Sequence, residues 1–158
     1  MEARLNAFKV APKAYQAMSA LQQYVNGCGL EESLMELVKM RASQINGCAY
    51  CLDMHSKDAR ANGETEQRLY LLYAWREAPF YSERERAALE WTEALTKITE
   101  GHVPDAVYMR VKTQFTDEEL ANLSMAIITI NSWNRLSIAF RAEPGHYQPK
   151  AAHAKSGS

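Results

Sequence analysis

The apolar residues of this chain recur every three or four positions along most of its length, and they seldom alternate at every second position. A period of three to four places side chains on one face of a helix, whereas strict alternation is typical of a strand. The stretch from Pro12 to Asn26 is representative, with Tyr15, Leu21 and Val25 on one stripe. The pattern predicts an all-α fold with no convincing strand.

Local signals divide the chain into about seven helices. Gly47 and Asn62-Gly63 supply C-terminal stops, Pro104 opens a short helix, and Ser82 to Glu85 and Thr116 to Glu119 match the capping-box pattern. The fourth segment is expected to pack through Leu69, Leu72 and Tyr73, with Tyr73 as a core or interface aromatic. The predicted helices are about 12–26, 31–46, 48–61, 65–75, a fifth from about 82, a sixth from about 104 and a seventh from about 116.

The domain organisation follows from length and composition. A chain of 158 residues with 47% apolar content is expected to form one compact domain that buries roughly 70% of its unfolded surface. No segment has the composition of an interdomain linker. We therefore expect a single helical domain over residues 1–148, followed by a flexible C-terminal tail over 149–158, which is small and polar.

Charge and hydropathy exclude several classes of partner. The net charge of −1 offers no basic field for a phosphate backbone, so we expect no nucleic acid partner. Neither a signal peptide nor an apolar segment long enough to cross a bilayer is visible, so we expect a cytoplasmic protein with no membrane partner. The three cysteines cannot form a fully paired disulfide framework. In a reducing compartment, a Cys-x-x-Cys pair is more often catalytic or metal-binding than structural.

The residues with the clearest chemistry are Cys48, Cys51 and His55, which share one face if the segment is helical. A Cys-x-x-Cys pair can close into a disulfide and reopen, and a histidine one turn from a thiol can take its proton. A free thiol is only about 3% ionised at neutral pH, so a reactive thiolate needs stabilisation. The start of a helix supplies it through free N–H groups and the helix dipole. This pattern predicts a redox site at the start of the third helix.

Spacing suggests separate roles for the two thiols. His55 lies four residues from Cys51 and seven from Cys48, which favours Cys51 as the attacking thiolate and Cys48 as the resolving thiol. The helix dipole alone favours Cys48. Glu36 lies twelve residues before Cys48, and the turn at Gly47 could return it to His55, although a solvated surface glutamate is an equal alternative from spacing alone. The chemistry needs no bound cofactor.

A zinc site is a second reading of the same residues. Cys48, Cys51, His55 and Glu36 have ligand types that zinc accepts. Structural zinc ribbons usually bring two Cys-x-x-Cys or histidine-rich halves together, and this chain has one. We therefore expect no metal at this site.

The motif resembles the Glu, Cys-x-x-Cys-x-x-x-His signature of the alkyl hydroperoxidase D-like (AhpD-like) proteins, which belong to the carboxymuconolactone decarboxylase superfamily. The resemblance covers about residues 5–148. It is carried by Glu36, Asn46-Gly47, Cys48-Ala49-Tyr50-Cys51 and His55, then by Trp75-Arg76, Phe80 to Trp91 and Ile130 to Leu136.

The resemblance implies an all-helical homo-oligomer, a trimer or hexamer, with antioxidant peroxidase activity. Its substrate would be an organic hydroperoxide and its reductant an external dithiol or protein. Cys51 would attack the peroxide and become a sulfenic acid, Cys48 would capture it, and His55 with Glu36 would relay the proton. The best-studied members have a histidine where this chain has Tyr50, and a phenol with a pKa near 10 cannot shuttle protons as imidazole does.

Two other functions use the same residues differently. In a decarboxylase or isomerase acting on a small lactone, His55 would serve as the base. The decarboxylase branch of the superfamily generally lacks the thiol pair, and its presence here argues against that activity. In a redox-sensing or adaptor protein without enzymatic activity, the Cys48 and Cys51 pair would switch oligomer or partner contacts. Rapid oxidation with negligible turnover would distinguish the sensor from the peroxidase.

Overall fold

The computed structural model describes residues 2–149, and these residues form eight α-helices, two short 3₁₀ helices and no strand. The all-α prediction is confirmed. Residues 150–158 of the predicted tail lie outside the described residues. In chain order the helices are α1 (Ala7–Val10), α2 (Pro12–Asn26), α3 (Glu32–Asn46), α4 (Ala49–Ala61), α5 (Glu66–Leu71), η1 (Leu72–Ala74), α6 (Glu83–Thr96), η2 (Ile98–Glu100), α7 (Asp105–Lys112) and α8 (Asp117–Phe140).

The helix count and numbering differ from the prediction of about seven helices. The extra helix α1 has four residues, too few to show a periodic pattern. The Asn6 side chain caps its start, and its Phe8 ring packs on Tyr15 of α2 at 3.9 Å between centroids, so a single cap and one packing contact hold it. Because α1 precedes the helices that were predicted, the Cys-x-x-Cys segment begins α4, and its assignment to the third helix was wrong.

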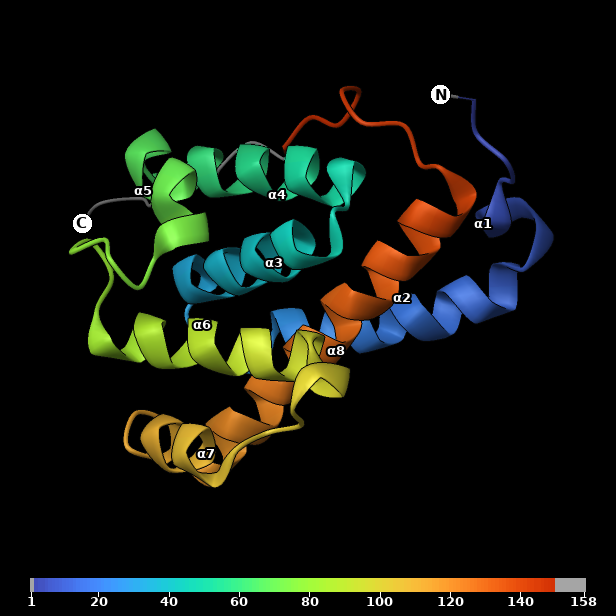
Figure 1. The fold of residues 1–158 in the computed structure, drawn as a ribbon. Helices are drawn as coiled ribbons and strands as arrows, with labels where there is room; N and C mark the ends of the chain where they lie inside the picture. The colour runs from blue at the N-terminus through green and yellow to red at the C-terminus, as the bar shows by residue number, and fades with distance from the viewer. Residues whose placement is uncertain (1, 150–158) are drawn as a thin grey trace, which may run out of the picture.

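Helix α3 lies at the centre of the fold and packs against α4, α6 and α8 (Figure 1). Its buried side chains therefore face three neighbours, and they include Leu34, Leu37 and Val38. The chain turns at Gly47, whose φ of 70° is the left-handed conformation that glycine adopts without strain. Helix α4 then returns alongside α3, and this hairpin brings residues of the two helices together.

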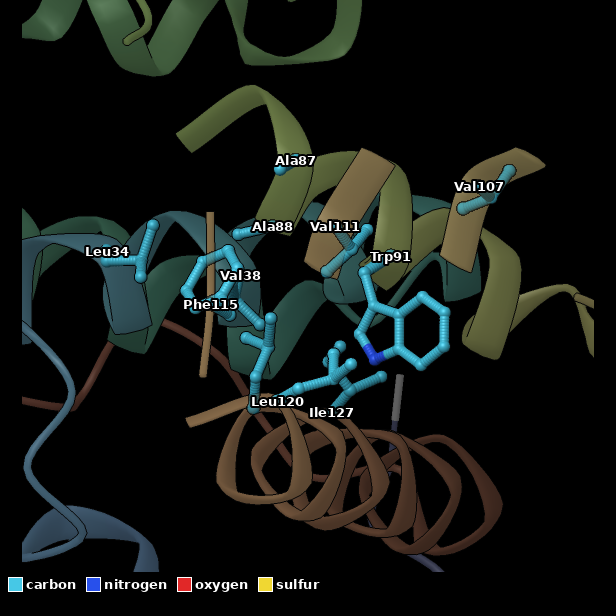
Figure 2. Packing of buried hydrophobic residues seen from close by; sticks show 11 residues of the cluster. Leu34, Val38, Ala87, Ala88, Trp91, Val107, Val111, Phe115, Leu120 and Ile127 are labelled. Atoms are coloured by element: carbon cyan, nitrogen blue, oxygen red, sulfur yellow. The ribbon is translucent and has the colours of Figure 1, made fainter. Parts of the chain in front are cut away.

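One large hydrophobic cluster fills the space between α3, α6, α7 and α8 (Figure 2). The Trp91 ring of α6 lies over α8, and the fully buried Val111 of α7 lies next to it in the middle of the cluster (Figure 2). The capping boxes predicted at Ser82 and Thr116 are both present and start α6 and α8. Tyr73 is not a core residue, because its side chain is 76% exposed and lies against the Arg41 guanidinium.

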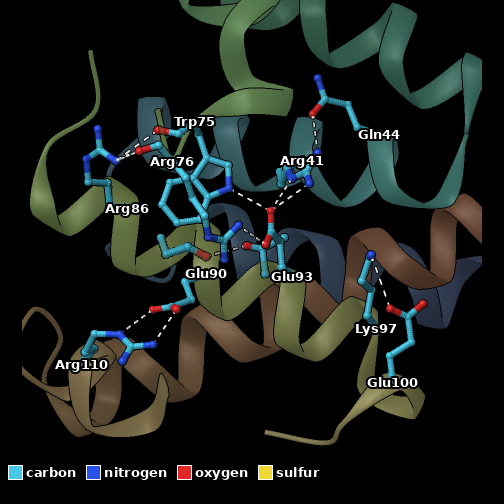
Figure 3. A network of polar contacts seen from close by, with 12 residues as sticks. Arg41, Gln44, Trp75, Arg76, Arg86, Glu90, Glu93, Lys97, Glu100 and Arg110 are labelled. Atoms are coloured by element: carbon cyan, nitrogen blue, oxygen red, sulfur yellow. Dashed lines mark hydrogen bonds and ion pairs between the residues drawn. The ribbon is translucent and has the colours of Figure 1, made fainter. Parts of the chain in front are cut away.

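The Glu93 carboxylate of α6 is the centre of a polar network on one side of the bundle (Figure 3). It accepts hydrogen bonds from the Trp75 indole at 2.8 Å, from Arg41 Nε at 2.9 Å and from Arg76 at 2.5 Å. Burial raises the pKa of Glu93, but the hydrogen bonds from Trp75 and Arg76 and the charge of Arg41 outweigh it and hold the pKa below its ordinary value. The ionised carboxylate thus ties α3 and the segment before α6 to α6.

We expect Glu93→Gln to destabilise the protein at pH 7 by about 1.5 to 3 kcal/mol, because it weakens several charge-assisted hydrogen bonds. A depressed pKa stabilises the fold above the unfolded value near 4.5, and this contribution is lost as the pH falls through the lower folded pKa. The difference in the free energy of unfolding between wild type and variant should therefore narrow below about pH 4.5. Urea unfolding at several pH values measures this difference. The control is Glu90→Gln. Glu90 lies on α6 like Glu93, but it pairs with the exposed Arg110 of α7 at the surface, and an equal loss of stability in this variant contradicts the assignment.

Candidate active site

Cys48 and Cys51 form a disulfide at the start of α4. Their Cα atoms are 5.4 Å apart, which is within the usual range for a disulfide, and both side chains are about 1% exposed. Cys48 is the N-cap residue of α4, and Cys51 lies in its first turn. The two sulfurs are packed against Ala42 of α3 and Ile130 of α8, with Trp133 partly buried beside them. The sequence prediction that these two residues lie together at a helix start is confirmed.

The helix start favours negative charge on the Cys48 sulfur. The backbone N–H of Cys51 donates a hydrogen bond to Cys48 Sγ at 3.4 Å. This N–H group has no backbone partner inside the helix, because it lies in the first turn. The first turn is also the positive end of the helix dipole. When the disulfide opens, the same N–H and the dipole stabilise the thiolate at Cys48. Cys48 is therefore suited to leave as a thiolate and to attack as one.

His55 and Glu36 face each other across the α3–α4 hairpin. His55 Nδ1 lies 3.1 Å from Glu36 Oε2, and both side chains are buried. The other carboxylate oxygen, Glu36 Oε1, accepts a hydrogen bond from Lys39 Nζ at 2.7 Å. Burial raises the pKa of Glu36, yet the His55 hydrogen bond and the nearby Lys39 charge outweigh it, so the pKa lies below its ordinary value. Glu36 is thus an ionised, oriented partner for His55, and not a solvated surface residue.

Two residues that the sequence analysis missed extend this pair. Side-chain ligand atoms of Glu36, His55 and Asp58 all lie within 4.8 Å of one another. The Tyr147 hydroxyl donates a hydrogen bond to Asp58 Oδ1 at 2.7 Å. Asp58 could have been found, because it lies three residues after His55 on the same face of α4. Tyr147 could not, because no local pattern connects it to α4.

The zinc alternative needs both sulfurs beside His55 and Glu36. Within the described residues, the group of close metal-ligand types consists of Glu36, His55 and Asp58 and does not include the cysteines. The two sulfurs are bonded to each other instead. The Lys39 ammonium on Glu36 also opposes a cation there. This oxidised arrangement does not bring together the four zinc ligands that the alternative requires.

A buried polar network holds the end of α3 against α8 near the disulfide. The Asn46 side-chain amide donates to Asn131 Oδ1 at 2.9 Å and to Asn134 Oδ1 at 2.8 Å. Asn134 in turn donates to the Ser43 hydroxyl at 3.0 Å. Because the turn at Gly47 directly follows Asn46, these bonds fix where α4 begins. The network therefore positions the Cys48 N-cap relative to α8.

A surface hollow lies on another face of α4. It has a volume of about 790 Å³ and is lined mainly by α4, α5 and the C-terminal segment, including Leu52, Lys57, Tyr70 and Pro149. Cys48, Cys51, His55 and Glu36 do not line it. The candidate active site is thus an enclosed cluster between helices.

No helix of the described residues is both long and apolar enough to cross a membrane.

Comparisons with known proteins agree with the geometry. The family model described as the carboxymuconolactone decarboxylase family matches residues 12–94, just over half of the chain. The uncharacterized protein YdfG of Bacillus subtilis is 45% identical over 139 residues, which is 88% of this chain and 95% of YdfG. The uncharacterized protein YnjA of Escherichia coli is 31% identical over 98 residues, 62% of this chain and 53% of YnjA.

Solved structures extend the comparison. A protein from Agrobacterium tumefaciens, described as a candidate antioxidant defence protein AhpD, has a TM-score of 0.89 and 44% identity over 92% of this chain and all of that one. The debrominase Bmp8 shares the fold with a TM-score of 0.76 at 19% identity, over 88% of this chain and 75% of Bmp8. The family match, the close relatives and the paired cysteines of α4 agree. The chain belongs to the carboxymuconolactone decarboxylase family, as an AhpD-like member.

Proposed function

We propose that this protein is a thiol-dependent peroxidase and disulfide reductase that removes organic hydroperoxides in antioxidant defence. The observation that carries the proposal is the buried Cys48–Cys51 disulfide at the start of α4, on the helix that also presents His55 to Glu36. A disulfide that opens and closes supplies two electrons per cycle, and the histidine and carboxylate supply a route for protons. No bound cofactor enters this chemistry.

The first half of the cycle is oxidation of the reduced protein. His55 accepts the proton of the Cys51 thiol, and the thiolate attacks the hydroperoxide ROOH. The S–O bond forms as the O–O bond breaks, so that Cys51 becomes a sulfenic acid and the peroxide leaves as RO⁻. The protonated His55 returns its proton to RO⁻, which gives the alcohol ROH. Glu36 holds the imidazole in place and stabilises its positive charge, which is why its ionised state matters.

The second half closes and reopens the disulfide. The Cys48 thiolate, stabilised by the Cys51 N–H, attacks the Cys51 sulfenic acid, and hydroxide leaves and takes up a proton to become water. One sulfur of an external dithiol then attacks Cys51, and Cys48 departs as the stabilised thiolate. The second sulfur of the dithiol attacks the first, which breaks the mixed disulfide, releases Cys51 as a thiolate and leaves the dithiol as a disulfide; the two protons of the dithiol pass to Cys48 and Cys51. The geometry at Cys48 suits both steps, because each needs a stable anion at that sulfur.

The comparisons support the proposal at different levels. The candidate antioxidant defence protein of Agrobacterium tumefaciens matches the whole length of its chain and 92% of this one. The debrominase Bmp8 shows that the same fold is used for other chemistry. The assembly belongs to the proposal as well: we expect a homotrimer or homohexamer, which light scattering after gel filtration measures directly.

The proposed function is tested by stopped-flow oxidation of the reduced protein with tert-butyl hydroperoxide at pH 7. We expect one equivalent of peroxide to consume two thiols and form the Cys48–Cys51 disulfide, identified by mass spectrometry. With dithiothreitol present, the protein should turn over repeatedly. Rapid oxidation without turnover on any dithiol would identify a redox sensor instead. Absence of thiol oxidation, together with His55-dependent turnover of a lactone, would identify a lyase.

A further inference from the structure

The segment after α8 returns across the molecule to α4 (Figure 1). We call residues 145–147 the strap. Lys57 Nζ donates to the carbonyl oxygens of Gly145 at 3.3 Å and Tyr147 at 3.1 Å, and the Gly145 N–H donates to Asp53 Oδ2 at 2.9 Å. Gly145 has a φ of 103°, which a residue with a side chain adopts only with strain. The strap is therefore fixed to α4 by its backbone.

This fixation places one side chain against the proton relay. The Tyr147 hydroxyl donates to Asp58 Oδ1 at 2.7 Å, and Asp58 lies within 4.8 Å of both His55 and Glu36 through their ligand atoms. Burial raises the pKa of Tyr147, and the bond to Asp58 raises it further, so the phenol stays a hydrogen-bond donor. This hydrogen bond fixes the orientation of the Asp58 carboxylate next to the His55 and Glu36 pair.

The charges around Asp58 come from three elements. His55 lies on α4 with it, Glu36 and Lys39 lie on α3, and the Tyr147 phenol lies on the strap. Lys39 is paired with Glu36, and the nearby Lys57 is bound by Asp53 and the strap carbonyls. The His55 imidazole therefore has two carboxylates close to it, and both face a positive charge that forms on the ring during the reaction.

We propose that Tyr147 is a positioning residue for the relay: it holds the Asp58 carboxylate beside His55, and Asp58 then stabilises the imidazolium that forms when Cys51 gives up its proton. The step moves one proton from the Cys51 sulfur to His55 and changes no oxidation state. Asp58 lies seven residues from Cys51, about 10 Å along the helix axis, so its direct repulsion of the thiolate is weak. Its main effect is to favour the ion pair of thiolate and imidazolium.

This inference rests on the proposed function, but its test needs no hydroperoxide. The reduced protein is alkylated with iodoacetamide between pH 5 and 9, and modification of Cys51 is followed by mass spectrometry, since the thiolate is the reacting form. The measured quantity is the pH at which the rate of Cys51 alkylation reaches half its maximum, called the midpoint below. We expect the midpoint to move upward by about one pH unit in Asp58→Asn, and by a smaller but resolved amount in Tyr147→Phe. Gly145→Ala should move it in the same direction by displacing the strap.

The matched control is Tyr70→Phe. It removes another tyrosine hydroxyl that donates to a carboxylate, that of Glu66 at 3.2 Å, and this pair is exposed on α5 and does not contact the relay residues. It should leave the midpoint unchanged. Circular dichroism at 20 °C checks that each variant is folded. A wild-type midpoint below pH 7.5 with an unchanged midpoint in Tyr147→Phe and Asp58→Asn overturns this inference alone. A wild-type Cys51 that ionises only near pH 8.5 contradicts the proposed function as well.

Discussion

Reduced protein carrying Cys51→Ser is expected to react with tert-butyl hydroperoxide at least about 1,000-fold more slowly than wild type. A serine hydroxyl is not ionised near neutral pH and is a poor nucleophile toward the O–O bond, so the first step has no substitute. Serine has nearly the same shape as cysteine, so the packing around the buried position 51 should stay the same in the variant. The loss of rate then reports the missing thiolate. Stopped-flow tryptophan fluorescence or competitive consumption of peroxide measures the rate.

The second thiol should behave differently. Cys48→Ser is expected to keep a first step within about tenfold of wild type, because the attacking thiolate and His55 remain, and to stop at a sulfenic acid that dimedone traps on Cys51. Cys28→Ser is the matched control, since Cys28 is the remaining cysteine and is not bonded in the structure. It should leave both steps unchanged. If Cys48→Ser loses the first step while Cys51→Ser retains it, the two roles are reversed.

His55→Gln is expected to lower the rate of oxidation at pH 7 by about 100-fold or more. Glutamine can keep a hydrogen bond to Glu36 but cannot accept the Cys51 proton, and general acid–base catalysis contributes roughly 10² to 10⁴ in rate. The loss should be partly recovered at high pH, where the thiol ionises without a base. The measurement is the stopped-flow rate between pH 6 and 10.

Glu36→Gln separates the relay from a general effect of lost charge. It removes the anion beside His55 while keeping the shape of the side chain, and we expect about a tenfold loss at pH 7, smaller than that of His55→Gln. Glu32→Gln on the same helix is the control, because its carboxylate bonds the exposed Asn62 and not the relay. Equal losses in both glutamine variants are incompatible with a specific role for Glu36.

Much of the architecture follows from local sequence. The starts of α6 and α8 were predictable because Ser82 and Thr116 satisfy free N–H groups through their own side chains. The turn before the cysteines was predictable because Gly47 is the residue that adopts a left-handed φ at little cost. These signals lie within a few residues of the boundary that they define, so no tertiary contact is needed to detect them.

Features that depend on distant contacts were not predictable in the same way. Tyr73 has the spacing of a core residue, but η1 follows α5 directly and changes the periodicity, so the ring faces outward against Arg41. Spacing alone left Glu36 undecided until the α3–α4 hairpin placed it 3.1 Å from His55. Tyr147 reaches Asp58 across 89 residues of sequence, a contact that only the folded chain reveals.

The most direct test of the account is a pH titration of the reduced protein, in which ultraviolet absorbance of the thiolate is followed in wild type, in Cys51→Ser and in His55→Gln. The account predicts a Cys51 thiolate that is present in wild type below pH 7.5, is lost in Cys51→Ser and forms only at higher pH in His55→Gln, and it predicts that peroxide converts this sulfur first to a sulfenic acid. If both thiols of the α4 pair ionise only near pH 8.5 in wild type, the helix start and the His55 relay do not activate them, and the account is contradicted.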